Sequence, residues 1–216
     1  MHWLAVLAAY LIGSLPFGYL VAMVVSREDI RTKGSGNIGA TNVARVLGAK
    51  WGILVLLLDA IKGLGPVWGL PRLFLDAGDP LFLHVQVACG LATIIGHMFP
   101  CYLKFSGGKG VATSLGVIMI LSPWATLAAF ATFVASILVS RIVSLSSMLA
   151  SVAFGGVLLW TLRPNPFSST TWSLAGFSLL IPTLIILRHR SNISRLLKGE
   201  EPKFQSKKKT QESKPT

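Results

Sequence analysis

Charged residues are scarce in this chain, and acidic residues are the scarcest of them. Only 13% of the 216 residues are charged and eight are Asp or Glu, whereas a soluble domain usually carries about 25% charged residues. Hydrophobic residues make up 52% of the chain and come in long blocks. This composition excludes an ordinary soluble core and predicts an integral membrane protein.

Cysteine is almost absent too, and so are the groupings that bind metals or form catalytic triads. Cys89 and Cys101 lie in or at the end of one apolar block, where a single helix cannot easily bridge them. No Cys or His cluster has metal-ligand spacing, so we expect no metal and no cofactor, and packing is the simplest role for both thiols. The pattern H-x-x-x-x-D is absent, and no order of Ser, His and Asp suggests a triad.

Long apolar blocks are what the chain has in abundance. Five of them are each near the roughly 20 residues that cross a bilayer as a helix. They lie at 3–25, 51–71, 81–103, 142–162 and 171–187. A further block at 111–140 is too long for one span, since its thirty residues would form a helix of about 45 Å. Split at Ser122-Pro123, it becomes two helices that are each short for a full span.

The distribution of Lys and Arg decides between one crossing and two in 111–140. With two crossings, 17 of the 20 basic residues lie on one side of the bilayer and two on the other. Cytoplasmic loops carry the excess of Lys and Arg, so two crossings are favoured. The sequence therefore predicts an all-α, polytopic bundle of seven transmembrane helices, with the N-terminus outside and the C-terminus in the cytoplasm. We expect the fourth and fifth spans to be short, tilted and shielded by protein.

Two parts are expected: one membrane domain, 1–203, and a Lys-rich cytoplasmic tail, 204–216. The tail has almost no apolar residue, so we expect it to be disordered. The net charge of +12 could suggest a nucleic-acid partner. The positive-inside rule accounts for that charge, so we expect membrane lipid and no nucleic acid around the chain.

A polar, glycine-rich segment follows the first span. Gly34, Gly36 and Gly39 match G-x-G-x-x-G, but that motif binds a dinucleotide only after a strand, and here a membrane helix precedes it. What remains is its physical core, because glycines let backbone N–H groups turn toward an anion and a following helix adds its positive end. A structured loop that only joins two helices is the alternative. The candidate binding residues are Ser35, Gly36, Asn37, Thr41, Asn42 and Arg45.

A second glycine-rich segment, Gly107-Gly108-Lys109-Gly110, opens directly onto the fourth predicted span. It is not a P-loop, since Lys109 is followed by glycine and the glycine spacing differs. It still places a lysine among flexible N–H groups at a helix N-terminus, which is an ordinary way to hold phosphate. His97, upstream of it, is most simply a hydrogen-bonded residue near a helix end.

Short polar groups recur at the other predicted cytoplasmic helix ends. Ser144 and Ser147 are three residues apart and could share a helix face. The same spacing relates His189 and Asn192 if that helix continues. The basic residues that the positive-inside rule explains by default are Arg188, Arg190 and Arg195.

One pair of charges, Asp59 and Lys62, lies inside a predicted span at a spacing of three residues. Charges within a membrane segment are costly and are usually paired or functional. The two side chains share a helix face, so mutual neutralisation is one interpretation and a functional role is the other.

Taken together, the motifs resemble one family. It is the bacterial acyl-phosphate:glycerol-3-phosphate acyltransferases, the integral membrane enzymes that begin phospholipid synthesis. The residues that carry the resemblance are G-S-G-N-I-G-A-T-N-V-A-R (34–45), D-A-I-K-G (59–63), G-H-M-F-P (96–100), G-G-K-G-V-A-T (107–113), V-S-L-S-S (143–147) and H-R-S-N-I-S-R-L-L-K-G-E-E (189–201). The resemblance covers nearly the whole chain, to about Glu201.

The resemblance implies seven spans in the bacterial plasma (inner) membrane, with an active site on the cytoplasmic face. It implies transfer of a fatty acyl group from acyl phosphate to the 1-hydroxyl of sn-glycerol 3-phosphate, giving lysophosphatidic acid and phosphate. It implies no metal and no acyl-CoA or acyl carrier protein as direct donor, and it leaves open a contact with the enzyme that makes acyl phosphate. By position it places Ser35, Arg45, Lys109, Ser147, His189 and Asn192 in the site, with Lys109, Ser147 and His189 catalytic. Gly107, Gly108, Gly110 and Ser144 are expected to bind substrate beside them.

The chemistry suits these residues. An acyl phosphate is already activated, so the harder task is to bring two anions together, and Lys109, Arg45 and the glycine N–H groups can do that. We expect the leaving phosphate to accept the hydroxyl proton while His189 orients the acceptor. A membrane transporter of a phosphorylated solute is the alternative, and it predicts charges and broken helices near the bilayer midplane, reached from both sides.

Overall fold

The structure, a computed structural model, describes residues 2–204, and every regular element in that range is a helix or a short 3₁₀ turn. The all-α prediction is therefore confirmed. The helices are α1 (Trp3–Gly13), α2 (Phe17–Ser26), α3 (Ala40–Leu47), α4 (Ala49–Gly69), α5 (Phe82–Met98), α6 (Val111–Leu121), α7 (Pro123–Ser140), α8 (Val143–Thr161), α9 (Trp172–Arg188) and α10 (Arg190–Leu197). The 3₁₀ turns are η1 (Ile30–Thr32), η2 (Pro71–Leu73) and η3 (Cys101–Leu103).

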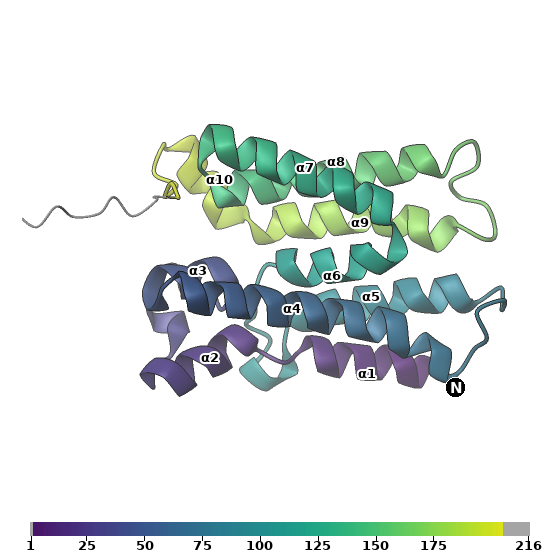
Figure 1. Cartoon of the computed structure of the whole chain (residues 1–216), viewed down its shortest axis with the longest axis horizontal. Coiled ribbons are helices and arrows are strands. Elements are labelled where there is room, and N and C mark those ends of the chain that lie inside the picture. Colours follow the sequence, from purple (N-terminus) through teal and green to yellow (C-terminus); the bar gives the residue numbers. More distant parts are fainter. Residues whose placement is uncertain (1, 205–216) are drawn as a thin grey trace, which may run out of the picture.

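The long helices run side by side in two layers, with α6 between them (Figure 1). One layer holds α7, α8 and α9, and the other holds α1, α2, α4 and α5. Val117 of α6 belongs to the same buried apolar cluster as Val67 of α4 and Phe154 of α8. The short helix α6 thus lies at the centre of the bundle and joins the two layers.

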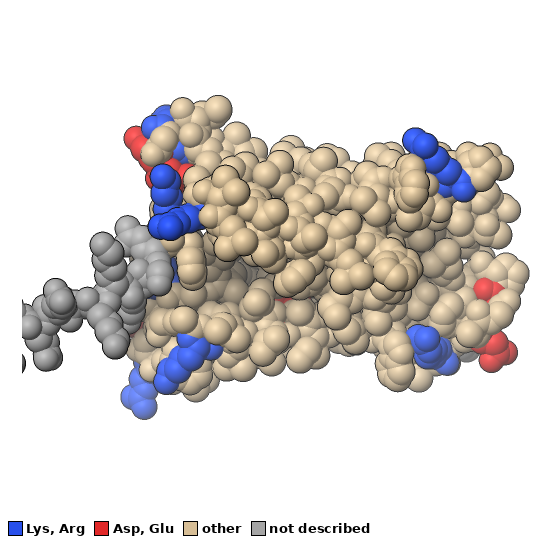
Figure 2. Space-filling view, turned by 45° about the horizontal axis from the view of Figure 1, so that its top comes forward, with Lys and Arg blue, Asp and Glu red and all other residues tan. Residues whose placement is uncertain are grey.

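Charged residues gather at the two ends of the bundle and leave an almost uncharged band between them (Figure 2). Large apolar side chains are exposed along the helices, such as Leu127 and Phe130 within α7, which are 57% and 58% exposed. A soluble protein rarely exposes so continuous an apolar surface, whereas lipid requires one. Five spans have the length and hydropathy to cross a membrane, or six if the bent pair α9 and α10 counts as one.

The fourth and fifth predicted spans differ from one another. The helix α6 has 11 residues, or about 16 Å, and it is too short to cross a bilayer unaided. It is also shielded by protein, as expected. The expectation was wrong for α7, which has 18 residues and only 17% of its length buried, so it is a full-length span that faces lipid. Seven spans, and the orientation of the two termini, stay predictions, because they require α6 to count as a span.

Small residues let α6 lie against the backbone of α4. A Cβ added to Gly116 would overlap the carbonyl oxygen of Ala60, and one added to Gly63 would overlap that of Thr113. Backbones approach this closely in membrane bundles only where the residues between them are small. The contact fixes the depth of α6, and with it the position of the glycine-rich segment that precedes it.

The first apolar block is broken into α1 and α2 at Pro16, a break that was not predicted. Proline lacks an N–H group and its ring clashes with the preceding turn, so the helix cannot continue through it. The two pieces together, Trp3–Ser26, still have the length of one span. The break leaves the carbonyl of Leu15 inside the bundle, where it accepts a hydrogen bond from Lys62 Nζ at 2.7 Å.

The end of the described chain returns to the bundle. The N–H of Phe204 donates to the carbonyl of Arg141 at 2.6 Å. Residues 205–216, nearly all of the predicted tail, lie outside the described residues. The boundary between a membrane domain and a disordered tail therefore stays a prediction.

Candidate active site

A polar cavity of about 240 Å³ lies where the segment before α3, the segment before α6 and the junction of α9 and α10 meet. Figure 1 shows α3 and α10 at the same end of the bundle. Its wall consists of Ser35, Asn37, Lys109, Leu187, Arg188, Arg190, Ser191 and Arg195. Ser35, Asn37 and Lys109, all predicted site residues, thus face one space although they are far apart in sequence.

Asn42 builds the first glycine-rich loop from within. It is 2% exposed, and its Oδ1 accepts from the N–H of Ser35 at 2.8 Å. Its Nδ2 donates to the carbonyls of Lys33 at 3.1 Å and Asn37 at 2.8 Å. Asn42 therefore shapes the loop and does not reach the cavity, while Ser35 and Asn37 are presented to it.

Several backbone N–H groups of this loop are already used within it. That of Gly36 donates to the carbonyl of Lys33 at 3.0 Å, and that of Gly39 donates to Asn37 Oδ1 at 2.8 Å. Gly36 has a φ of +70°, a conformation that favours glycine. These two N–H groups and that of Ser35 hold the loop, and the side chains of Ser35 and Asn37 face the cavity.

The second glycine-rich loop is held from both sides. The N–H of Gly108 donates to the carbonyl of His97 at 3.0 Å, and a Cβ on Gly108 would overlap the His97 imidazole. From the other side, Arg188 Nη2 donates to the carbonyls of Gly107 at 3.0 Å and Gly108 at 2.9 Å. Gly110, with a φ of +83°, then starts α6. Only glycines fit this path, and it carries Lys109 to the cavity wall.

Lys109 belongs to a chain of hydrogen bonds that ends on Glu201. Its Nζ donates to Asn192 Oδ1, and Asn192 Nδ2 donates to Glu201 Oε1 at 2.5 Å. The same oxygen accepts from Ser144 Oγ at 2.7 Å, and Oε2 accepts from Arg195 Nε at 2.7 Å. The structure therefore brings together Lys109, Asn192 and Ser144, three predicted site residues, and adds a carboxylate that was not predicted.

The electrostatics of the site are dominated by cations. Burial is the main cause that lowers the pKa of Lys109 from 10.5 to about 8. The charges of Arg195, Arg45 and Arg188 contribute to this shift, while the charge of Glu201 acts against it. A bound anion would reverse this shift, since an opposite charge favours the protonated amine. Around Lys109, the positive charges therefore outnumber the negative ones.

His189 lies at the 61° bend between α9 and α10 and is 2% exposed. Its Nδ1 is 2.8 Å from the carbonyl of Ile185. A carbonyl only accepts, so Nδ1 carries the proton and Nε2 keeps a free lone pair. Burial, and then the charge of Lys109, lowers the pKa of His189 from 6.5 to about 4. The imidazole is therefore neutral at pH 7 and is a weak base.

The predicted residues Ser147, Thr41 and Arg45 are not among those that line the cavity. Ser147 is buried one turn after Ser144, and its Oγ donates to the carbonyl of Val143 at 2.9 Å. Thr41 and Arg45 are exposed on α3 at a spacing of four residues, so they share a face. The charge of Arg45 reaches Lys109, as its effect on the Lys109 pKa shows. No hydrogen bond links Thr41 to the part of the site that the structure describes.

Sequence reasoning missed most of the residues that α9 and α10 contribute. Arg188, Arg190 and Arg195 were explained as juxtamembrane charges, and Ser191 and Glu201 were not singled out. One signal was available for α10, because Ser191 and Arg195 are four residues apart and lie on the same helix face as Asn192. Arg188 belongs to α9, before the 61° bend. Glu201 carried no such signal, since it follows the end of α10 and meets its partners only through the turn at Gly199.

Comparisons with known proteins agree on one family. A family model described as glycerol-3-phosphate acyltransferase matches residues 3–199. A protein of that name from Myxococcus xanthus is 48% identical over 199 residues, which is 92% of this chain and 97% of the relative. A protein of the same name from Syntrophotalea carbinolica is 45% identical over 205 residues, which is 94% of this chain and 98% of the relative.

Two crystal structures of PlsY (YgiH), an integral membrane glycerol 3-phosphate acyltransferase, are similar in fold. The glycerol 3-phosphate form is 38% identical, with a TM-score of 0.83 over 94% of this chain and 96% of its own. The lysophosphatidic acid form is 37% identical, with a TM-score of 0.80 over 94% of this chain and 95% of its own. The similarity covers 94% of this chain and so extends over both layers of the bundle.

Proposed function

This chain belongs to the glycerol-3-phosphate acyltransferase family, and we propose that it transfers a fatty acyl group from acyl phosphate to the 1-hydroxyl of sn-glycerol 3-phosphate. The products are lysophosphatidic acid and inorganic phosphate. The observation that carries this proposal is the cationic cavity at one end of an apolar bundle. Both substrates are phosphate anions, and the donor also has a chain that stays in lipid.

The cavity has the charge that such a reaction needs. Lys109, Arg188, Arg190 and Arg195 all contribute to its wall. The Glu201 carboxylate contacts one of them, Arg195, at 2.7 Å, and is linked to Lys109 through Asn192. Two phosphate groups brought into this space would neutralise the excess and would be spared their mutual repulsion.

The bonds change in a simple order. The 1-hydroxyl oxygen attacks the acyl carbonyl carbon, the bond from that carbon to the phosphate oxygen breaks, and the hydroxyl proton passes to the leaving phosphate. Lys109 stabilises the negative charge that develops on the carbonyl oxygen and the leaving group. The N–H of Gly108 is engaged with His97, so Gly107, Gly108 and Gly110 serve by holding Lys109 in place.

His189 orients the acceptor in this scheme. Its Nε2 lone pair can accept a hydrogen bond from a hydroxyl of glycerol 3-phosphate. A histidine with a pKa of about 4 is poorly suited to remove a proton at pH 7. The weak basicity of His189 therefore supports the leaving phosphate as the proton acceptor.

Hydroxyl and amide groups complete the proposed site. Ser35 and Asn37 reach the cavity as neutral donors. Asn192 accepts directly from Lys109 and donates to Glu201, which Ser144 also holds. Ser147 shares a helix face with Ser144, and its oxygen can accept a hydrogen bond from substrate while it donates to Val143. The further substrate contacts proposed for α3 are Thr41 and Arg45, with Gly36 and Asn42 shaping the loop before them.

The proposed setting is the bacterial inner membrane, with the cavity at its cytoplasmic face and α6 counted as one of seven spans. The excess of basic residues at the cavity end supports this orientation. The test is accessibility labelling of single cysteines in intact cells, with Cys89 and Cys101 replaced. Position 33 should be protected from an impermeant reagent, and positions 76 and 167 should react. Protection of 76 and reaction of 33 would reverse the orientation.

The activity itself is tested with purified protein in lipid. With palmitoyl phosphate and glycerol 3-phosphate, it should release phosphate and form lysophosphatidic acid, and chelators should have no effect. Palmitoyl-CoA should not replace palmitoyl phosphate. Comparable turnover with palmitoyl-CoA would contradict the proposed donor. Entry of glycerol 3-phosphate into vesicles without any acyl transfer would favour the transporter instead.

A further inference from the structure

Three titratable side chains are buried inside the bundle and take no part in the mechanism above. Asp59 and Lys62 lie on α4 and His97 lies near the end of α5, and none is more than 4% exposed. Groups of this kind are costly in a membrane protein and are kept where they have a partner or a function. The question is what they contact beyond each other.

The three groups share one oxygen. Lys62 Nζ is 2.7 Å from Asp59 Oδ1, and His97 Nδ1 is 3.5 Å from the same atom. One ammonium therefore balances one carboxylate, and the imidazole extends the cluster from α4 to α5. Neutralisation explains why Asp59 and Lys62 occur as a pair. It does not explain why Lys62 also contacts the break between α1 and α2, or why His97 also contacts the loop before α6.

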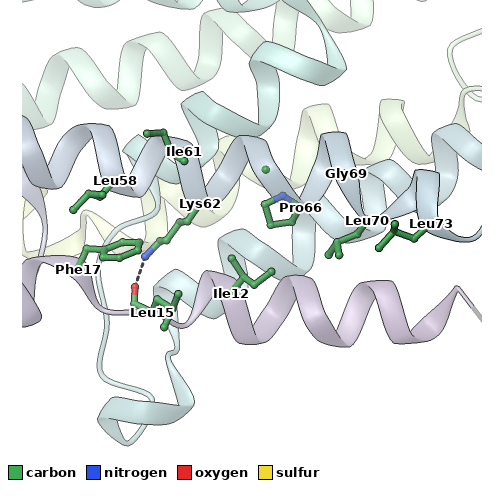
Figure 3. Close-up of a pocket in the computed structure, with 11 residues that line it drawn as sticks. Ile12, Leu15, Phe17, Leu58, Ile61, Lys62, Pro66, Gly69, Leu70 and Leu73 are labelled. Carbon is green, nitrogen blue, oxygen red and sulfur yellow. Dashed lines mark hydrogen bonds between the residues drawn. The ribbon is translucent and has the colours of Figure 1, made fainter.

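At one end the cluster reaches the break in the first span. Figure 3 shows Lys62 extended toward the carbonyl of Leu15, with the Phe17 ring beside it, along an apolar cavity of about 460 Å³. The hydrogen bond to Leu15 is 2.7 Å long, and the ammonium is 5.4 Å from the Phe17 ring centroid. Lys62 thus ties α4 to the point where α1 ends and α2 begins.

At the other end the cluster reaches the loop that carries Lys109. The His97 ring lies directly against the backbone of Gly108, so closely that a Cβ on Gly108 would overlap the ring. The carbonyl of His97 also accepts from the Gly108 N–H at 3.0 Å. The His97 ring therefore limits how close the Gly108 backbone can come to α5. Because Lys109 is the next residue, the ring also affects where the Lys109 side chain begins.

We propose that Asp59, Lys62 and His97 form a positioning network that sets the place of the Lys109 ammonium. Lys62 holds Asp59 beside the Leu15 break, the Asp59 carboxylate faces the His97 ring at 3.5 Å, and the ring and Arg188 both contact Gly108. This proposal rests on the proposed function, because its main tests measure kcat/KM for phosphate release. It assigns a role in the reaction to residues that touch no substrate.

The first test removes the support under Gly108. His97→Ala should lower kcat/KM for phosphate release by about 10²-fold, since a displacement of about 1 Å in a catalytic group has costs of that size. His97→Gln, which can still fill the space and bond to Asp59, should recover at least tenfold of it. Thr93→Val is the matched control, because Thr93 is fully buried one turn earlier on α5 and bonds only to Cys89.

The readout separates positioning from folding. Each variant is compared with Thr93→Val by its melting temperature and by kcat/KM of the folded protein. A loss of rate in His97→Ala that greatly exceeds that in an equally destabilised Thr93→Val supports the network. Equal rates in the two variants, or a His97→Ala rate within twofold of wild type, would overturn it.

A second test uses the contact itself. Gly108→Ala should lower kcat/KM strongly, because the new methyl group meets the His97 ring. In the double variant with His97→Ala the ring is gone, so the methyl group has room and the combined loss should be smaller than the product of the two. Losses that multiply would show that the ring does not support Gly108.

A third test asks whether charge balance is all that the pair provides. Asp59→Asn and Lys62→Met each leave one buried charge without its partner, and both should destabilise the protein. The double variant restores neutrality, so its melting temperature should recover. Its kcat/KM should stay at least about tenfold below wild type, because the Leu15 carbonyl has lost its donor and the His97 ring no longer faces a carboxylate. Full recovery of the rate would confine the pair to neutralisation and overturn its place in the network.

Failure of the proposed function remains distinguishable. If wild-type protein releases no phosphate from palmitoyl phosphate, the activity is wrong, and binding of inorganic phosphate by calorimetry becomes the readout of the same variants. His97→Ala should then bind phosphate about tenfold more weakly than Thr93→Val, as expected for a displaced cation. Equal affinities would overturn the network independently of the reaction.

Discussion

Two groups of charged side chains in this protein follow opposite rules. In the middle of the bundle, Asp59 and Lys62 cancel each other within 2.7 Å. At the end of the bundle, four cations line one cavity, and the Glu201 carboxylate, which contacts one of them, Arg195, accepts hydrogen bonds from three donors. The charges of the inner pair are balanced, whereas the outer group has more positive than negative charge.

The difference shows what each group is for. An unpaired charge in the apolar interior would be strongly destabilising, because it loses its hydration without gaining a partner. Charges are therefore found there as balanced pairs. An uncompensated cluster of cations near water is tolerable, and it becomes favourable when an anion binds. The excess of positive charge is therefore the reason that we propose the ligand site there, and the balanced pair belongs to the positioning network proposed above.

The largest effect is expected from removing a cation of the outer group. Lys109→Ala should lower kcat/KM by at least about 10²–10³-fold, the usual cost of losing one oxyanion donor. Lys109→Arg should restore only part of it, because a planar fork cannot replace a compact ammonium in a loop this tightly held. Lys50→Ala, at an exposed lysine outside the cavity, is the control in the same phosphate-release assay. A loss below tenfold for Lys109→Ala would remove the distinction between the two groups.

The next largest effect is expected at the carboxylate. Glu201→Gln weakens three hydrogen bonds to one charged group, and at about 1.5–3 kcal/mol for such a bond we expect a loss of roughly 10–100-fold in kcat/KM. Burial alone would raise the pKa of Glu201, but hydrogen bonds from Asn192, Ser144 and Arg195 outweigh it and hold the pKa below 4.5.

The same lowered pKa sets a direction for stability. The ionised carboxylate stabilises the fold above about pH 4.5, and this stability is lost as the pH falls through the folded-state pKa. Melting temperature measured against pH should therefore fall more steeply on acidification in wild type than in Glu201→Gln. Parallel curves would show that Glu201 does not anchor the outer group through its charge.

A smaller effect is expected at His189. His189→Ala should weaken the use of glycerol 3-phosphate by about 2–10-fold, the worth of one neutral hydrogen bond, and His189→Gln or His189→Asn should recover part of that loss. With a pKa of about 4, neutral His189 should cause no inflection of the rate near pH 6.5. Because the unfolded state binds this proton first, the contribution to stability rises with pH between about 4 and 6.5.

The pH–rate profile at saturating substrate decides the role of His189. If every substitution of His189 abolishes the chemical step and the wild-type rate follows one ionisation near 6.5, His189 is the general base. The leaving phosphate would then no longer be needed as proton acceptor.

The smallest effect is expected from the end of the chain. Truncation after Phe204 keeps the contact between Phe204 and Arg141 and the whole outer group, so kcat/KM should stay within about twofold of wild type. Truncation after Gly199 is the informative counterpart, since it also removes Glu201. A large loss from the shorter deletion alone would give residues 205–216 a catalytic role that their composition does not suggest.

Much of the architecture could be predicted without a structure. The positions of α4, α5, α8 and α9 agree with the apolar blocks to within a few residues. The same is true of the split at Ser122-Pro123, where α6 ends and α7 begins. These features follow from the average hydropathy of some twenty consecutive residues and from proline, which are local properties.

The site was predictable only in part, for a related reason. Glycine-rich surroundings predicted Lys109 and Ser35, and helical spacing predicted Asn192 and Ser144. Glu201 did not, because its three partners lie up to 57 residues away in sequence. Arg188 was not predicted as a site residue, because the positive-inside rule already explains a cation at the end of a span whether or not it binds a ligand.

What the sequence by itself determined is the class of the protein, the course of most of its helices, the family and the polar segments that meet at one end. The tertiary structure alone decided that α7 faces lipid, that Arg188 and His97 hold the Gly107–Gly108 loop between them, and that Asp59 and Lys62 reach that loop through His97. Hydropathy and charge act along the chain and can be summed residue by residue. A contact between α4, α5 and the loop before α6 depends on how closely small residues let helices approach, and that distance exists only once the bundle has packed.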